Sequence, residues 1–485
     1  MKSVYKPWVV LSLALALAAG ARAQQQQQSQ TQSQQPQQSQ EQPAQPIPAY
    51  HSPLAGLSNG SDEATSSSDL QPDQRPLSGV QDLALGISRP EHSFWEPNAV
   101  VYSTVDSDPL SSSTETGWVT YTTLLAGIDI HKMSQNSDLT VSYLGGGMIS
   151  NDPGVGNSVT QELQLGETLN LNRSTLSFFE QTSYAPEMSF GGGAAGLTLP
   201  GGNLGLQTGF LPDESILTTR GQRISSTSIG QWNYNLTPRS SLTFVGGYSL
   251  LHFFGTDLLN FGDVIFQGGY NYQLTRADTI AVLYNFNADR FTGNQSIDDN
   301  KVNISYGRRV TGRLAFQIAA GPEVASLRLN NTGTGGGTTT TTAVTRAYWS
   351  MTSGLSYQMR RAQLAASYYH GVNGGSGVLA GAVGDSVSGT ASTVFSRTMN
   401  GGVNGGFARN GSVTASGPSN QVFDYWFGGA NLNRSWGRAL NLGLSYQFQH
   451  QTSNGSFCIG PTCGNYLTRH MIIVSLSWRD RPLLF

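Results

Sequence analysis

Histidine is the residue most often used for catalysis and metal binding, and this sequence spaces its histidines in no pattern typical of either. Two histidines that bind one zinc ion on a helix stand four residues apart, as in H-x-x-x-H or H-E-x-x-H, and no such pair occurs. The seven histidines stand singly at positions 51, 92, 131, 252, 370, 450 and 470. We therefore predict that the chain is not an enzyme and has no catalytic, metal-binding or cofactor-binding residue.

Two triple-glycine runs, Gly145–Gly147 and Gly191–Gly193, look superficially like phosphate-binding loops. A P-loop also requires a Lys followed by Ser or Thr and a helix after the loop, and neither run has them. We therefore expect no phosphate site. A lipase that brings Ser, His and Asn together from separate strands leaves no local motif, so the sequence alone leaves that alternative open.

The only two cysteines are Cys458 and Cys463, in the segment Cys-Ile-Gly-Pro-Thr-Cys. The Gly-Pro pair between them favours a turn, and in an oxidising compartment such a spacing predicts a disulfide that closes a small loop. The alternatives are an idle thiol pair and a metal site. A metal site would need further ligands, and the nearest histidines, His450 and His470, lie outside the loop.

Charged residues are scarce in this chain of 485 residues. Asp, Glu, Lys and Arg make up 12% of it, against about 25% in a typical soluble domain. The net charge of −3 argues against a nucleic-acid-binding protein, which needs a basic surface. No stretch after residue 23 approaches the roughly 18 apolar residues of a membrane-spanning helix, and 47 aromatic residues (8 Trp, 19 Tyr, 20 Phe) exclude disorder throughout. A large, exported, β-rich protein remains.

Residues 1–23 predict a signal peptide. Lys2 and Lys6 form a basic start, Val9–Ala19 is a short apolar core, and Ala21-Arg22-Ala23 is a cleavage pattern of the A-x-A type. The alternative is a cytoplasmic protein with a hydrophobic N-terminus. The segment 24–95 is rich in Gln, Pro and Ser, with 14 Gln between residues 24 and 46. Such a segment buries too little apolar surface to fold, and we expect a disordered periplasmic spacer, with an interaction segment as the alternative.

From residue 96 the sequence alternates between apolar and polar residues with a period of two. In one run Val264, Phe266 and Tyr270 fall on one face and Gln267 and Asn271 on the other. Side chains of a strand point alternately to opposite faces, so each run predicts a strand with one apolar and one polar face. A soluble antiparallel sheet has the same local pattern.

The spacing of the turns narrows the choice of fold. Links within a hairpin take a few residues, whereas links between hairpins run from seven residues (151–157) to 36 residues (186–221). Short turns at one end and long loops at the other are typical of outer-membrane barrels. A propeller also repeats at about 40 residues but lacks this asymmetry. The tight turns fall near residues 134, 172, 238, 276, 311, 360, 398 and 436.

We therefore predict an all-β fold: one closed antiparallel transmembrane β-barrel of about 18 strands, spanning residues 96–485. Eight short turns join sixteen strands, and a first strand near Asn98–Val105 and a last near Tyr466–Trp478 complete the count. Sixteen or twenty strands remain possible if the first strand or the Gly-rich region 372–420 is misread. Aromatic residues near the short turns, such as Trp232, Tyr234 and Tyr272, suit the headgroup level of a bilayer. A soluble sandwich core is the alternative explanation for these aromatics.

These features, together with the C-terminal aromatic Phe485, resemble those of bacterial outer-membrane β-barrel proteins. The similarity is greatest to porin-like barrels of mostly unassigned function, some of them linked to exopolysaccharide systems. In that family the terminal aromatic usually ends the last strand. Here the segment Arg479–Pro482 interrupts the alternation after Trp478, which implies that Phe485 is an assembly signal on a short tail.

The resemblance implies a location in the bacterial outer membrane and passive diffusion of small hydrophilic solutes. A polysaccharide secretion pore and a non-conducting structural or adhesive barrel are the alternatives. The implied partners are outer-membrane lipid, lipopolysaccharide, the barrel-assembly machinery and small hydrophilic solutes; no nucleic acid and no cofactor is expected. The sequence leaves a trimer and a monomer equally open.

Charged residues of a membrane barrel belong in the lumen, because they are costly on the lipid face. The long link Pro186–Gly221 and its flank carry charges of both signs, and we expect this link to fold inward and narrow the pore, with an outward loop as the alternative. Glu167 contradicts the pattern because it shares the apolar face of its strand, which requires either a bulge or a wrong face assignment. The candidate pore residues are Asp213, Glu214, Arg220, Arg223, Asp289, Glu323 and Arg346, and Arg290, Arg308, Arg309, Arg313 and Arg328 are further charges expected inside the barrel.

Overall fold

A computed structural model of the chain describes residues 92–108, 117–151, 156–185, 216, 221–254, 259–292, 295–331, 340–374, 379–413, 422–454 and 466–485. All of them belong to one compact unit, Pro46–Phe485. The predicted signal peptide (1–23), nearly all of the Gln/Pro/Ser-rich segment and both cysteines lie outside the described residues.

Strands make up the regular structure of these residues. No described helix is long and apolar enough to cross a membrane. The strands are β1 (Phe94–Asp106), β2 (Val119–Met133), β3 (Ser137–Ser150), β4 (Ser158–Asn170), β5 (Ser174–Ala185), β6 (Arg223–Thr237), β7 (Ser240–Phe253), β8 (Phe261–Gln273), β9 (Asp278–Phe291), β10 (Gln295–Arg309), β11 (Leu314–Asn331), β12 (Thr340–Gln358), β13 (Ala362–Asn373), β14 (Ala382–Ser396), β15 (Met399–Ser412), β16 (Val422–Trp436), β17 (Leu440–Ser453), β18 (Tyr466–Arg479) and β19 (Leu483–Leu484).

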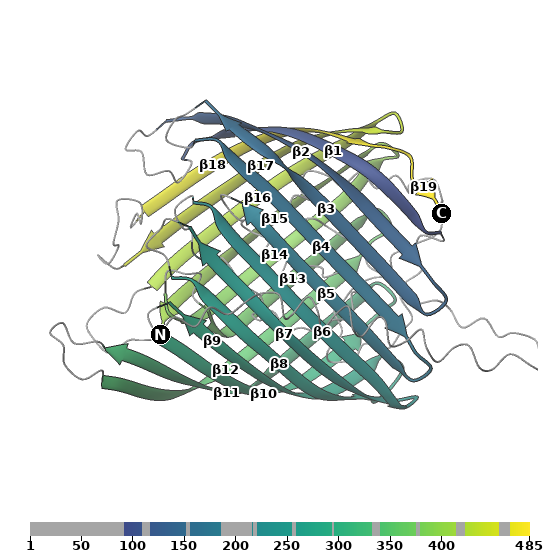
Figure 1. Ribbon diagram of the computed structural model, residues 1–485. Coiled ribbons are helices and arrows are strands. Elements are labelled where there is room, and N and C mark those ends of the chain that lie inside the picture. The colour runs from purple at the N-terminus through teal and green to yellow at the C-terminus, as the bar shows by residue number, and fades with distance from the viewer. Residues whose placement is uncertain are drawn as a thin grey trace, which may run out of the picture. The chain divides into compact units, whose positions relative to one another are not determined.

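The sheet closes on itself. Each strand from β1 to β18 pairs in antiparallel fashion with its neighbour in the sequence, and β1 also pairs with β18, from Asn98 opposite Arg479 to Asp106 opposite Met471. Figure 1 shows the resulting ring of tilted strands. Closure satisfies the backbone groups of the two strands that would otherwise form open edges. The predicted closed barrel of about eighteen strands is confirmed.

The eight predicted tight turns are all present. They occupy residues 134–136, 171–173, 238–239, 274–277, 310–313, 359–361, 397–398 and 437–439, between the strand ends given above. The last of these turns contains Gly437, whose φ of 77° lies in the region that favours glycine. All eight lie at one end of the barrel, called here the short-turn end. The opposite end carries the longer connections, with one exception: only residues 292–294 join β9 to β10, so the expectation of at least seven residues for every link at this end was wrong.

The C-terminus differs from the expected free tail. After Arg479 leaves the sheet, Leu483 and Leu484 pair with Trp95 and Phe94 at the start of β1 and form the two-residue strand β19. The backbone N–H of Phe485 also donates to the carbonyl oxygen of Ser93, at 3.3 Å. The last residues therefore continue the sheet along the β1 strand, beyond the interruption that the sequence shows.

The two faces of the wall are as the alternation predicts. On β8, the outward side chains of Val264 and Phe266 are 48% and 44% exposed, whereas the inward side chain of Gln267 on the same strand is fully buried. Glu167 faces outward, and the register of β4 is continuous with both neighbours. Neither the predicted bulge nor a wrong face assignment is needed. Glu167 stands three residues from the end of β4 at the short-turn end, where Ser137 Oγ donates to its carboxylate at 3.4 Å.

Candidate functional site: the lumen of the barrel

The outer surface is built for lipid. Large apolar side chains point outward along the strands, and examples such as Leu124, Ile304 and Leu444 are 50–60% exposed. A bilayer core offers no hydrogen-bond partners, so a spanning sheet must close and present an apolar exterior. A closed β-barrel of this size with such an exterior is the architecture of bacterial outer-membrane proteins. The chain is an outer-membrane β-barrel.

The inner wall is polar but mostly uncharged. The inward positions of most strands carry Ser, Thr, Asn or Gln, which are the residues with both donors and acceptors for hydroxyl-bearing solutes. Side chains of this kind on the inner face are Thr123, Gln164, Gln231, Thr243, Ser249, Gln267, Asn271, Thr279, Asn285, Asn303, Ser305, Ser350, Ser356, Asn433, Asn441, Ser445, Gln449 and Ser475.

A cluster of five charged side chains lies on the inner wall formed by β8 to β11. Lys301 Nζ lies 3.1 Å from Asp299 Oδ2 and 3.0 Å from Glu323 Oε1. Asp263 and Asp289 stand directly opposite each other on β8 and β9. All five side chains are buried. The sequence analysis found Asp289 and Glu323 but missed Asp299, Lys301 and Asp263, although each shares the inward parity of its strand.

At the end with the long connections, the end of β13 and the start of β14 bend into the barrel. The backbone N–H of Val372 donates to Glu323 Oε1 of β11 at 3.2 Å, two strands away. Gly381, with φ of 82°, lies so close to Ile297 of β10 that a Cβ would collide with it. We call this part, residues 371–374 and 379–383, the inward tip. It lies over the inner faces of β8 to β11 at the end with the long connections.

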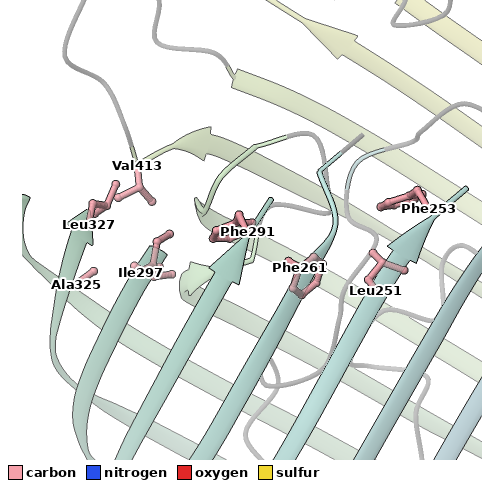
Figure 2. Packing of buried hydrophobic residues seen from close by; sticks show 9 residues of the cluster. Leu251, Phe253, Phe261, Phe291, Ile297, Ala325, Leu327 and Val413 are labelled. Atoms are coloured by element: carbon pink, nitrogen blue, oxygen red, sulfur yellow. The ribbon is translucent and has the colours of Figure 1, made fainter. Parts of the chain in front are cut away.

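An apolar cluster seals the space between the inward tip and the wall. Figure 2 shows its side chains at the ends of neighbouring strands, with Val413 beside Leu327. The members of the cluster on β7 to β11 have inward parity on their strands, at the end with the long connections. The cluster consists of Leu251, Phe253, Phe261, Phe291, Ile297, Ala325, Leu327, Val372 and Val413, with Tyr348, Ala380 and Val383 packed against it.

The connection between β5 and β6 reaches the same region. Its described residue Ile216 is fully buried and packs with Leu379, Ala382 and Phe423. Leu379 and Ala382 belong to the inward tip, and β14 and β16 lie about half-way round the closed sheet from β5 and β6. Ile216 therefore contacts the far side of the barrel interior, as an inward-folded connection requires.

The seam between the first and last strands carries ion pairs on its inner face. Arg469 of β18 and Asp106 of β1 are fully buried and joined by three close contacts: Nε to both carboxylate oxygens at 3.1 Å, and a terminal guanidinium nitrogen to Oδ2 at 2.6 Å. Toward the short-turn end, Arg479 lies 3.4 Å from Glu96 and 3.8 Å from Asp129. Each end of the seam is therefore linked by opposite charges.

The structure places some of the predicted pore residues inside the barrel. Arg223 begins β6, is 1% exposed, and its guanidinium carbon lies 5.1 Å from the centre of the Phe253 ring. Arg346 donates to the carbonyl oxygen of Val413 at 3.3 Å. The other residues predicted for this group, Asp213, Glu214 and Arg220, lie outside the described residues, as do Cys458 and Cys463.

Three arginines that the sequence analysis placed inside the barrel point outward. Arg290 and Arg328 flank Asp298, at 2.7 Å and 3.7 Å, and their side chains are 55% and 62% exposed. Arg308, 52% exposed, pairs with Asp278 at the short-turn end. The prediction was wrong because these residues lie at strand ends, beyond the apolar belt, where water and lipid headgroups solvate a charge.

Two histidines of the described strands each lie against one carboxylate. His131 Nε2 lies 2.7 Å from Asp138 on the inner wall, and His370 Nδ1 lies 2.6 Å from Asp385 on the outer face. Among the described residues, no three His, Cys, Asp or Glu side chains are arranged to bind a metal ion.

No protein-family model matches this chain, and no curated protein matches it. Solved structures of outer-membrane proteins are similar to it. Pseudomonas aeruginosa OccK2 (OpdF) in complex with glucuronate has a TM-score of 0.40 and 10% identity, covering 80% of this chain and 98% of that chain. Acinetobacter baumannii OccAB3 has a TM-score of 0.39 and 11% identity, covering 80% and 99%. The siderophore receptor PiuA from Acinetobacter baumannii has a TM-score of 0.42 and 10% identity, covering 80% and 70%.

Proposed function

We propose that the chain is an outer-membrane channel, and not an enzyme, through which small hydrophilic solutes diffuse passively. The observation that carries this proposal is the contrast between the two faces of the closed wall. Eighteen strands enclose a lumen wide enough for an aqueous channel, and the inner wall offers amide and hydroxyl groups where the outer wall offers Leu, Val and aromatic rings.

The chemistry of the inner wall favours uncharged solutes such as sugars. Sugar hydroxyl groups both donate and accept hydrogen bonds, as do the amide of Gln447 and the hydroxyls of Thr140 and Ser477, which have inward parity and are only partly buried. Most of the described inner charges are already paired within the wall, such as Arg469 with Asp106 and Lys301 with Glu323. A paired charge attracts a charged solute less than a free one.

The inward tip supports a narrow rather than a wide channel. It occupies part of the lumen at the end with the long connections, and Ile216 meets it from the other side. In the proposed channel this level sets the upper size of a solute. Lipid, lipopolysaccharide and the barrel-assembly machinery are the partners that an outer-membrane barrel of this kind requires.

Single-channel recording tests the proposal. Purified full-length protein in planar bilayers is expected to give stepwise, steady conductance, and vesicles that contain it are expected to take up small sugars. Folded protein that gives no conductance indicates a structural barrel. Passage of polysaccharide, in place of small sugars, indicates a secretion pore.

A pair of cysteine variants on β17 shows whether the current runs through the lumen. Gln447→Cys faces the lumen, and Tyr446→Cys beside it faces outward, 42% exposed; both are made with Cys458 and Cys463 replaced by Ser. A charged thiol reagent is expected to reduce the conductance of Gln447→Cys only. An equal response of both variants contradicts a path through the barrel.

A further inference from the structure

A carboxylate faces outward at mid-height on the barrel wall. Glu180 stands near the middle of β5, six residues from Ser174 and five from Ala185, and has the same parity as the outward, exposed Leu176 and Phe178. Its neighbours across the sheet are Leu165 on β4 and Ser228 on β6.

The aromatic residues around Glu180 fix its depth. Four residues toward the short-turn end, Leu176 pairs with the exposed Trp232. Four residues toward the other end, Tyr184 lies against Phe254, with ring centres 6.1 Å apart. Because aromatic girdles mark the two interfaces of the bilayer, Glu180 lies in the hydrocarbon layer between them.

Three hydroxyl groups of the same wall surround this carboxylate. Thr182 Oγ1 and Ser226 Oγ lie 2.9 Å and 3.0 Å from Glu180 Oε1, and Ser228 Oγ donates to Oε2. Thr182 and Ser226 also lie 3.0 Å from each other. The result is a polar patch bordered by the outward apolar side chains of Leu165, Leu176 and Phe178. No described Lys or Arg forms an ion pair with Glu180.

A shallow depression adjoins the polar patch. Gly230 of β6 and Gly246 of β7 stand directly opposite each other on the outward face. A Cβ built on Gly246 would meet nothing within 4 Å, and one on Gly230 would meet only the Gly246 carbonyl oxygen, at 3.9 Å. Trp232, Phe244 and Tyr248 border this place and are 37–49% exposed. Small residues in a membrane-facing surface let a second backbone approach closely.

We propose that the outer face of β5 to β7 is the interface with a second copy of this chain. Lipid tails offer no hydrogen bond and no charge to an outward carboxylate, whereas a second barrel wall excludes the lipid and supplies polar groups. We call this face, with Glu180, Thr182, Ser226, Ser228, Gly230, Gly246 and Tyr248, the β5–β7 patch.

The β5–β7 patch complements itself. Glu180, Ser228 and Tyr248 form one row across the three strands; the first is an acceptor, and the last has a hydroxyl donor that forms no hydrogen bond with any described residue. A two-fold axis near Ser228 brings Tyr248 of each copy opposite Glu180 of the other. The Tyr248 hydroxyl lies over Gly262 of β8 within one copy, and in the interface it turns toward that carboxylate. In a two-fold interface each contact occurs twice in this reciprocal way.

Cross-linking through engineered cysteines tests the interface in native outer membranes. Ser228→Cys, made with Cys458 and Cys463 replaced by Ser, is expected to form a disulfide-linked dimer on mild oxidation. The matched control is Val403→Cys on β15, which also faces lipid and is 57% exposed, on the other side of the barrel. No dimer with Ser228→Cys, or equal dimer with both variants, overturns the proposal.

Two further variants separate loss of the interface from loss of folding. Gly246→Trp has room within one copy but fills the depression, and Glu180→Leu places an ordinary lipid-facing residue in the patch. Native mass spectrometry of the full chain is expected to show the mass of two copies, and each variant is expected to raise the dimer dissociation constant about tenfold or more, with the folded band on unheated gels retained. A monomeric parent chain, or variants that dimerise as the parent does, overturns the proposal. This readout does not depend on conductance.

Discussion

The ion pair at the seam gives the sharpest test of how the barrel is closed. Asp106→Asn keeps the shape of the side chain but leaves the guanidinium of Arg469 without its opposite charge. Both side chains are fully buried, and three contacts of 2.6–3.1 Å join them. Because removal of one partner leaves an uncompensated buried charge, the free energy of unfolding is expected to fall by about 3–5 kcal/mol, a large part of the 5–15 kcal/mol of a typical domain.

The backbone pairing at the seam is also short, and among strands β1 to β18 only β12 with β13, at eight residue pairs, has a shorter register. The register of β1 with β18 covers nine residue pairs, from Asn98 to Asp106, whereas that of β1 with β2 covers thirteen. The ion pairs at its two ends therefore supplement a short backbone register. The loss is to be measured by denaturant titration of the barrel in lipid vesicles, followed by tryptophan fluorescence.

An exposed ion pair of the same type serves as the control. Asp424→Asn breaks the pair of Asp424 with Arg409, whose side chains are 34% and 56% exposed, and is expected to cost at most about 1 kcal/mol. The double variant Asp106→Asn with Arg469→Met is expected to recover much of the loss, because no buried charge is left unpaired. A loss from Asp106→Asn no larger than that from the control would refute the reasoning.

Three further predictions follow, two from the barrel interior and one from the two cysteines. Two variants are expected to displace the inward tip and so raise single-channel conductance. Gly381→Ala places a Cβ against Ile297, and Ile216→Asp puts a charge into a fully buried apolar contact. Unchanged conductance in folded protein would contradict a constriction there. Lys301→Met leaves the buried carboxylates of Asp299 and Glu323 without the positive charge that they pair with, and it is expected to lower the free energy of unfolding by about 3–5 kcal/mol near pH 7. Because acid neutralises carboxylates, this loss relative to the parent is expected to shrink toward pH 4. An equal loss at both pH values argues against the mechanism. Protein isolated from outer membranes is expected to contain Cys458 and Cys463 as a disulfide, so mass spectrometry after alkylation without reductant should find neither residue alkylated.

The barrel could be predicted because its signals are local. A strand shows its two faces within about five residues, as Val264, Phe266 and Gln267 do, and a tight turn is a short run of turn-forming residues. An even number of antiparallel strands then lets the sheet close and places both chain ends at the same end of the barrel. The β19 pairing of Leu483 with Trp95 was not visible in this way, because it joins positions that are distant in the sequence.

The charges show where a local rule failed. Asp299 and Lys301 share the inward parity of Asn303, so alternation alone would have placed them beside Glu323. Arg290 and Arg328 were assigned to the lumen because a charge on the lipid face is costly, but that rule holds only within the apolar belt. Distance from the strand end, and not charge alone, decides the face on which such a residue is tolerated.

The inward tip was the feature that sequence reasoning missed, yet part of its signal lies in the wall that it covers. Leu251, Phe261 and Ile297 occupy inward positions at the outer ends of their strands, and an apolar side chain facing an aqueous lumen is unfavourable unless something packs on it. Neighbouring strands that repeat this exception at the same level require a cover, and the Gly-rich region 372–420 contributes it through Val372 and Val413. If the proposed channel conducts, these two levels have different consequences for a solute: the apolar level with the inward tip would restrict its size, and the amide and hydroxyl groups of the wall would exchange hydrogen bonds with it.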